Sequence, residues 1–81
     1  KTIEPKDKEF ISTAIDLMPE EPWDDNTWEI WTSAIKEKTN RKGKELFLPL
    51  REAFTGVSHG PEMKKLIQLI GRNKIIERVK F

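Results

Sequence analysis

The side chains best suited to binding chemistry form a basic group in the middle of the chain. Arg41, Lys42 and Lys44 lie close together, and Arg51 follows seven residues after Lys44. Cationic side chains around helix ends and turns suit contacts with phosphate groups. The planar guanidinium of Arg51 can also donate parallel hydrogen bonds to a phosphate or to a base edge. The alternative is an ion pair with a nearby acid such as Glu52, which the local pattern by itself favours.

Other kinds of chemistry find little support in the sequence. The chain has no cysteine and one histidine, His59, which has no ligand partner at metal-binding spacing. Its serines stand outside nucleophile motifs, and no glycine-rich phosphate loop occurs. The carboxylate pairs Glu20–Glu21 and Asp24–Asp25 flank expected helix starts, where interaction with the helix dipole explains them. We therefore predict no active site and no metal site within this chain.

The tryptophans allow two interpretations. Trp23, Trp28 and Trp31 could stack on nucleic-acid bases. Their spacing, however, follows one side of a helix, and aromatic residues at that spacing are more often part of a core. We therefore assign them to the core.

Composition predicts a single small domain. The 81 residues have a mass of 9.5 kDa, and 36% are apolar and 36% charged, which leaves room for one core. Residues 1–31 hold three lysines and nine acids, a net charge of −6, whereas residues 32–81 hold twelve basic residues and five acids, a net charge of +7. Such asymmetry suggests an anionic partner for the basic part. The start lacks a signal peptide, no run of apolar residues could span a membrane, and the chain reads as a segment of a longer protein.

The elements that must position these side chains are helices. Apolar residues recur at three- and four-residue steps, without sustained two-residue alternation. Pro49 falls inside the third apolar stripe and must either delay that helix or kink it. We predict an all-α fold, a small irregular bundle of about five helices forming one domain over residues 1–81. The first expected helix runs from Pro5 or Lys6 to Pro19, and the second from a cap among Asp24, Asp25 and Asn26 to about Asn40. The third covers residues 46–54 and ends in a left-handed cap at Gly56. The fourth runs from Pro61 to Gly71, and a short fifth covers residues 75–79.

Four motifs in the second half of the chain carry a family resemblance. They occupy residues 41–51, 53–56, 60–63 and 69–72, and read RKGKELFLPLR, AFTG, GPEM and LIGR. In this order they resemble the C-terminal stretch of bacterial-type glutamyl-tRNA synthetases. The resemblance covers residues 41–80, and the helix at 28–38 is compatible with it.

The resemblance implies both the parent protein and the role of this segment. The family's enzymes are cytoplasmic class I ligases that use ATP and Mg to attach glutamate to tRNA, with the catalytic domain at the N-terminal end. Their C-terminal half is an all-α cage of two subdomains that holds the anticodon loop. This chain resembles the second subdomain. We therefore expect it to bind tRNA beside the preceding subdomain of a monomer, with no catalytic residue, cofactor or membrane contact of its own.

The resemblance also implies roles for individual residues. The arginine of the family's PLR motif falls on Arg51, where it reads the last anticodon base. A splayed base in a single-stranded loop can be hydrogen-bonded on its Watson–Crick edge. Gly60 and Pro61 fall where the family's helix start approaches the middle base, and Met63 is the following apolar contact. Some members have Thr-Pro here; Gly60 can offer only its backbone. Arg41, Lys42 and Lys44 are expected to contact phosphates, on grounds of charge alone.

Two further functions compete with this one. A small helical DNA-binding domain would prefer a duplex, although the segment from Gly56 to Pro61 is an awkward turn for a helix-turn-helix. A protein-interaction bundle would use the acidic first helix and Trp23, and would bind a protein independently of salt.

Overall fold

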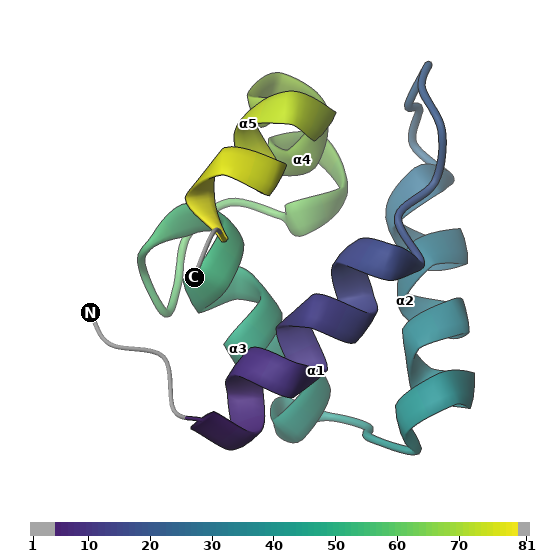
Figure 1. The fold of residues 1–81 in the computed structure, drawn as a ribbon. Coiled ribbons are helices and arrows are strands. Elements are labelled where there is room, and N and C mark those ends of the chain that lie inside the picture. Colours follow the sequence, from purple (N-terminus) through teal and green to yellow (C-terminus); the bar gives the residue numbers. More distant parts are fainter. Residues whose placement is uncertain (1–4, 80–81) are drawn as a thin grey trace.

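The computed structural model describes residues 5–79, which form five helices and no strand (Figure 1). This result confirms the predicted all-α fold and the number of helices. The helices are α1 (Pro5–Asp16), α2 (Thr27–Thr39), α3 (Lys44–Thr55), α4 (Met63–Ile70) and α5 (Arg72–Arg78).

The helices close into a ring of contacts. Helix α1 packs against α2 and α3, α4 packs against α2 and α5, and α5 packs against α3. In Figure 1, α1 runs across the front of the molecule, α2 stands at one side, and α4 and α5 lie together above α3. Residues that are distant in sequence are thereby brought together around one shared core.

Trp31 lies at the centre of that core. Its side chain is fully buried, and its ring stacks on Phe54 with centroids 5.1 Å apart and planes inclined by 17°. Its Nε1 donates a 2.8 Å hydrogen bond to the carbonyl oxygen of Ala14, near the end of α1. The other large side chains that are fully buried come from all five helices: Phe54, Ile11, Ile35, Leu46, Leu50, Ile67 and Ile75.

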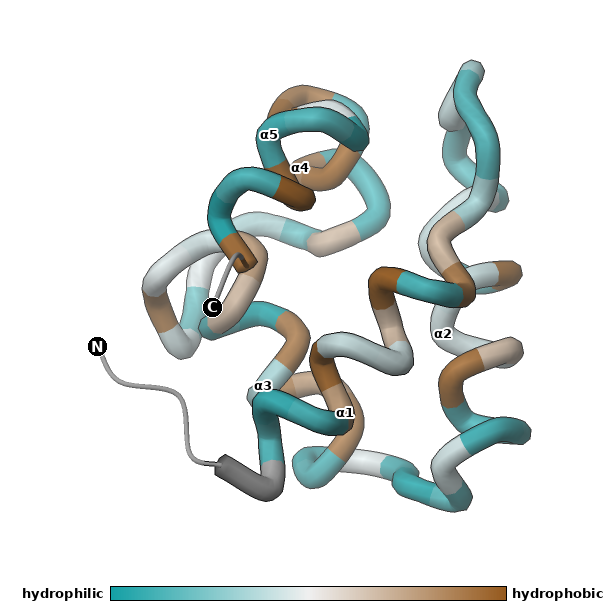
Figure 2. Tube along the Cα trace, in the orientation of Figure 1, coloured by the Kyte–Doolittle hydropathy of each residue, from teal (hydrophilic) through white to brown (hydrophobic). Residues whose placement is uncertain are grey.

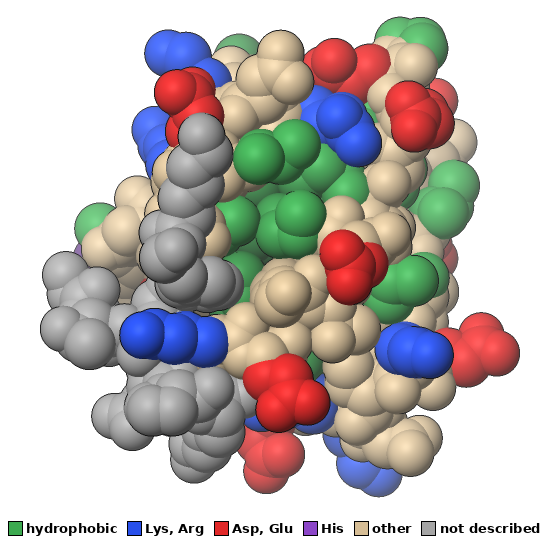
Figure 3. Space-filling model, in the orientation of Figure 1, with side chains coloured by type: hydrophobic (Ala, Val, Ile, Leu, Met, Phe, Trp, Pro, Cys, Tyr) green, Lys and Arg blue, Asp and Glu red, His purple; other side chains and the backbone are tan. Residues whose placement is uncertain are grey.

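The hydropathy pattern agrees with this packing. Figure 2 shows hydrophobic residues recurring along each helix between hydrophilic ones, as expected for amphipathic helices. Figure 3 shows one face of the molecule, with charged side chains scattered around hydrophobic ones that lie between α1 and the α4–α5 pair.

One predicted helix start is confirmed and another needs correction. Asn26, one of the three predicted caps, stands at the cap position of α2, although its side chain makes no capping bond; the Asp24 backbone N–H donates to the Thr27 hydroxyl at 2.8 Å. Pro61 is not the first residue of α4, which begins at Met63. Gly60, with φ of 152°, and Glu62, with ψ of 133°, keep this segment out of the helical region.

The third helix settles the question that Pro49 raised. Helix α3 begins at Lys44, directly after Gly43, and continues through Pro49 to Thr55. Its end is the predicted glycine cap: Gly56 has a φ of 84°, and its N–H donates to the Glu52 carbonyl. The proline therefore does not delay the helix, and the residues on either side of it share one helix.

Candidate functional site

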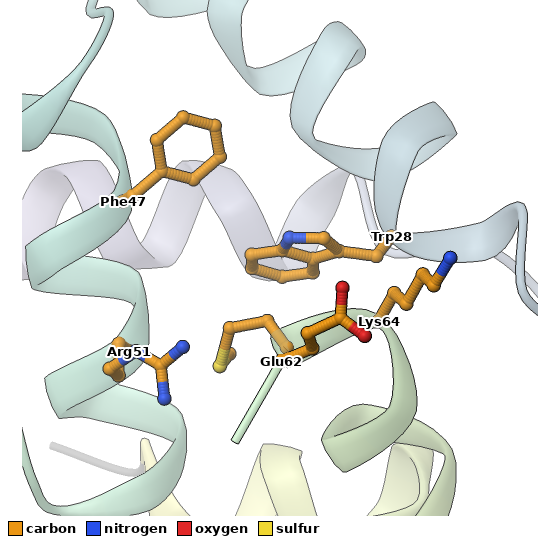
Figure 4. A pocket seen from close by; sticks show the side chains of 6 residues that line it. Trp28, Phe47, Arg51, Glu62 and Lys64 are labelled. Atoms are coloured by element: carbon orange, nitrogen blue, oxygen red, sulfur yellow. The ribbon is translucent and has the colours of Figure 1, made fainter. Parts of the chain in front are cut away.

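Arg51 extends from α3 toward Glu62 and the start of α4 (Figure 4). Its Nη1 atom is buried, and no acceptor for it exists in the described part of the chain. The ion pairs between described residues join other partners, so the alternative of an Arg51 ion pair is not found among them. A buried donor without an acceptor is costly and calls for an explanation. The described part of the chain therefore leaves this donor of Arg51 unsatisfied.

The loop between α3 and α4 passes directly against this guanidinium. A Cβ atom built on Gly60 would lie 3.3 Å from Nη1 of Arg51, which is tighter than an ordinary van der Waals contact. The φ of 152° at Gly60 is also one that residues with a side chain rarely adopt. Glycine is therefore favoured here both by the backbone and by the close approach of Arg51.

A pocket of about 270 Å³ opens beside Arg51. Its walls come from α2, α3 and the start of α4, and they are formed by Trp28, Phe47, Arg51, Glu62, Met63 and Lys64. In Figure 4 the indole of Trp28 and the ring of Phe47 lie on one side, and the guanidinium of Arg51 lies across from them. The two ring centroids are 6.5 Å apart. Aromatic walls beside the donor groups of Arg51 and Lys64 suit a flat heterocycle that carries acceptors.

A second pocket of about 240 Å³ lies on the other side of Phe47 and Arg51. These two residues belong to both pockets and form a ridge between them. The rest of its lining comes from α3, the residue before it and the following loop: Gly43, Lys44, Leu48 and Ser58. Lys44 thus lies within reach of a ligand placed across the ridge.

The structure brings some of the sequence-predicted residues together and separates others. Arg51 and Met63 line the same pocket, and Gly60 approaches Arg51 closely. Pro61 is exposed in the same loop and is not part of the pocket lining. Whether these residues contact RNA stays a prediction.

The three basic residues around the start of α3 lie in different environments. Lys44 lines the second pocket, and Lys42 is exposed in the turn. Arg41 faces α1, where it binds Asp7 at 3.1 Å and lies 4.0 Å from the ring centroid of Phe10. The phosphate contact predicted for Arg41 therefore competes with interactions inside the protein.

The sequence analysis placed Trp28 in the core and did not single out Phe47, the other aromatic wall of the pocket. Trp31 is fully buried, as the core assignment predicted, but Trp28 is only half-buried and Phe47 is 39% exposed. A usable signal was the four-residue step from Phe47 to Arg51, which places both on one face of a helix. Nothing in the sequence marked Glu62 and Lys64 as pocket residues, apart from their position near an expected helix start.

Asp25 ties α4 to the loop before α2. Its carboxylate accepts hydrogen bonds from Lys65 Nζ at 2.9 Å and from Gln68 Nε2 at 3.0 Å. These hydrogen bonds, that of Gln68 first and then that of Lys65, lower the pKa of Asp25 below its usual value. Both charged side chains are exposed, so the pair contributes little stability at neutral pH.

This lowered pKa gives an expected pH dependence. Because the pKa of Asp25 is lower in the folded than in the unfolded chain, its contribution is complete above the unfolded value and disappears as the pH falls through the folded value. We expect Asp25→Asn to lower Tm by about 2 °C at pH 7 and by nothing once wild-type Asp25 is protonated. Thermal scans from pH 7 to pH 2 measure this difference. The matched control Glu20→Gln, an exposed acid in the same loop, should show no such trend; identical pH profiles for the two variants would contradict the prediction.

The described residues lack two other kinds of site. No helix among them has the length and apolarity needed to cross a bilayer. Over residues 5–79 there is also no cluster of three or more His, Cys, Asp or Glu side chains that could hold a metal ion.

An aromatic pocket beside a guanidinium that has no internal acceptor, on a small helical domain, suits the binding of an unpaired base. Comparison with known families agrees with this interpretation. The family described as "Anticodon binding domain" matches residues 1–81, and the chain belongs to that family. Membership favours anticodon binding over the DNA-binding and protein-interaction alternatives.

The chain is also similar to curated glutamate–tRNA ligases of bacteria. It is 54% identical over 74 residues to glutamate–tRNA ligase 2 of Bartonella tribocorum, a match that covers 91% of this chain and 16% of the relative. It is 53% identical over 75 residues to glutamate–tRNA ligase 1 of Rhodospirillum rubrum, covering 93% and 17%. The chain thus spans about one sixth of the length of these relatives. No solved structure matches it.

Proposed function

We propose that this chain is the part of a glutamate–tRNA ligase that holds the anticodon loop, while the remainder of the longer protein attaches glutamate to the tRNA using ATP and Mg. The observation that carries the proposal is the buried, unpartnered Nη1 of Arg51 beside the pocket of Trp28 and Phe47. Family membership and the relatives' activity support it. In this proposal the segment carries no catalytic residue and acts in the cytoplasm, next to the preceding subdomain of a monomeric enzyme.

In the proposed complex, a base of the anticodon loop leaves the stack and enters the pocket. Trp28 and Phe47 offer their faces to the base, and stacking of this kind contributes about 1–3 kcal/mol per base. Arg51 donates to acceptors on the Watson–Crick edge. A guanidinium has donors only, so it favours cytosine, which presents O2 and N3, over guanine, which presents two N–H groups at that edge.

The remaining predicted contacts follow from the same placement. The backbone of Gly60 and Pro61 meets the middle base, and Met63 gives an apolar contact at the pocket wall. Lys44, beside the ridge, and Lys42, in the exposed turn, contact phosphates. These contacts would make the affinity depend on salt.

An NMR titration of the 81-residue chain at low salt tests the proposal. The ligands are a glutamate anticodon stem-loop, three loops in which one anticodon base is changed, with C to G at the last position, and a DNA duplex. We expect shifts centred on Arg51, Gly60 and Met63 that shrink most with the last-base change. Equal, diffuse shifts over the basic residues for every ligand would contradict base reading, and a preference for the duplex would favour DNA binding.

A further inference from the structure

The guanidinium of Arg41 connects two helices that lie far apart in sequence. It covers the ring of Phe10 with its central carbon 4.0 Å from the centroid, and Nη1 lies 3.1 Å from the carboxylate of Asp7. Both partners belong to α1. The same Nη1 donates to the carbonyl oxygen of Glu45, in the first turn of α3, at 3.2 Å. Only 23% of the Arg41 side chain is exposed.

The Glu45 carbonyl needs this donor because of Pro49. In an α-helix each carbonyl accepts from the N–H four residues later. The residue four positions after Glu45 is Pro49, which has no N–H. Arg41 therefore supplies, from outside the helix, the hydrogen bond that the proline removes.

The turn that Arg41 completes runs from Glu45 to Pro49, so it contains Phe47 and directly precedes the turn that carries Arg51. Phe47 comes two residues before Pro49 and Arg51 two residues after it, and these residues form the ridge between the pockets. A proline inside a helix permits a kink. Because Phe47 lies before Pro49 and Arg51 after it, the angle of the helix at this point sets how these two side chains are oriented relative to each other along the ridge.

We propose that Arg41 is a positioning residue for RNA binding: by bonding the Glu45 carbonyl while held on α1, it fixes α3 at Pro49 and thereby orients Phe47 and Arg51. The RNA part of this inference rests on the function proposed above, whereas the link between Arg41 and Pro49 does not. The competing role is the direct phosphate contact that the charge pattern predicted for Arg41.

Substitution by lysine separates the two roles. Arg41→Lys keeps the charge, and lysine binds phosphate well as a point charge. A lysine cannot reproduce the planar group that covers Phe10 and bridges Asp7 to Glu45. A phosphate contact therefore survives Arg41→Lys, and the positioning role does not.

The first test measures Tm for the wild-type chain, Arg41→Lys, Pro49→Ala and the double variant. We expect Arg41→Lys to lower Tm by about 5 °C in the wild-type background and by distinctly less in the Pro49→Ala background, where the backbone N–H of the introduced alanine satisfies the Glu45 carbonyl directly. The matched control is Arg78→Lys, because Arg78 also donates to a carbonyl of α3, that of Phe54 at 2.9 Å. Its effect should be the same in both backgrounds. Equal losses from Arg41→Lys in both backgrounds would overturn the link.

The second test measures RNA binding at 10 °C. It compares only those variants whose Tm, measured in the first test, shows that they are folded at this temperature. We expect Arg41→Lys to bind the glutamate stem-loop about fivefold more weakly and to distinguish it less well from the last-base variant. The slope of log K against log salt should stay the same, and Pro49→Ala should partly restore the discrimination.

Two outcomes would overturn the positioning role. One is unchanged affinity and discrimination in Arg41→Lys, together with a salt slope reduced by about 0.7 in Arg41→Gln, which would assign Arg41 to a phosphate. The other is a wild-type chain that does not discriminate between the loops, which would overturn the proposed function as well. The Tm comparison would still report on the Arg41–Pro49 link.

Discussion

Replacing Trp31 by alanine is expected to unfold the domain at room temperature. Truncating a buried tryptophan costs about 3–5 kcal/mol, which is comparable to the total stability of about 4–5 kcal/mol expected for a domain that buries as little surface as this one. The change also removes the stacking on Phe54 and the hydrogen bond to the Ala14 carbonyl. Urea unfolding followed by circular dichroism measures the loss.

Ile30→Ala is the matched control for this experiment. Ile30 precedes Trp31 in α2, but its side chain is 62% exposed. Its truncation should change stability by no more than about 0.5 kcal/mol. If Trp31→Ala behaved like Ile30→Ala, Trp31 would not be the centre of the core.

Replacing Arg51 by alanine is expected to abolish base discrimination while leaving the fold intact. Stability should change little, because Nη1 is buried without an acceptor and its removal breaks no hydrogen bond among the described residues. The preference for the matched anticodon loop should fall by about 1–3 kcal/mol, roughly 5- to 150-fold in relative Kd. Calorimetric titration with matched and last-base-changed loops measures this preference.

Arg51→Lys serves as the charge-preserving control. We expect it to retain the salt-dependent attraction to RNA, since the charge remains, and to lose base discrimination, since the fork is absent. An alanine variant with wild-type preference for the matched loop would remove Arg51 from the site.

The helices could be predicted because their apolar periodicity reports directly on burial. In α1, for example, Phe10, Ile11 and Ala14 recur at helical spacing and all are buried. The left-handed cap at Gly56 could also be predicted, because glycine adopts a positive φ at low cost.

The sequence could not show which apolar residues lie at the edge of a helix face. Phe47 belongs to the same apolar stripe as Leu46 and Leu50, yet only those two are fully buried. Periodicity identifies the apolar face of α3, but the extent to which other helices cover that face depends on tertiary packing. For this reason Phe47 was not predicted as a wall of the pocket, whereas Arg51 was identified through the family resemblance.

The contacts of Arg41 could not be predicted from the sequence for a different reason. Its partner Asp7 lies 34 residues away, and no local pattern relates the two. Charge clustering therefore grouped Arg41 with Lys42 and Lys44, although the turn after α2 directs it to α1.

The aromatic cluster makes the domain an optical reporter of its own binding site. The ring of Trp31 lies 5.7 Å from that of Trp23 and 5.8 Å from that of Trp28, distances at which indoles exchange excitation energy. Trp28 is the member that borders the pocket. A molecule that quenches Trp28 would therefore also lower the fluorescence emission of Trp23 and Trp31. Occupancy of the pocket can thus be followed by intrinsic fluorescence without a label.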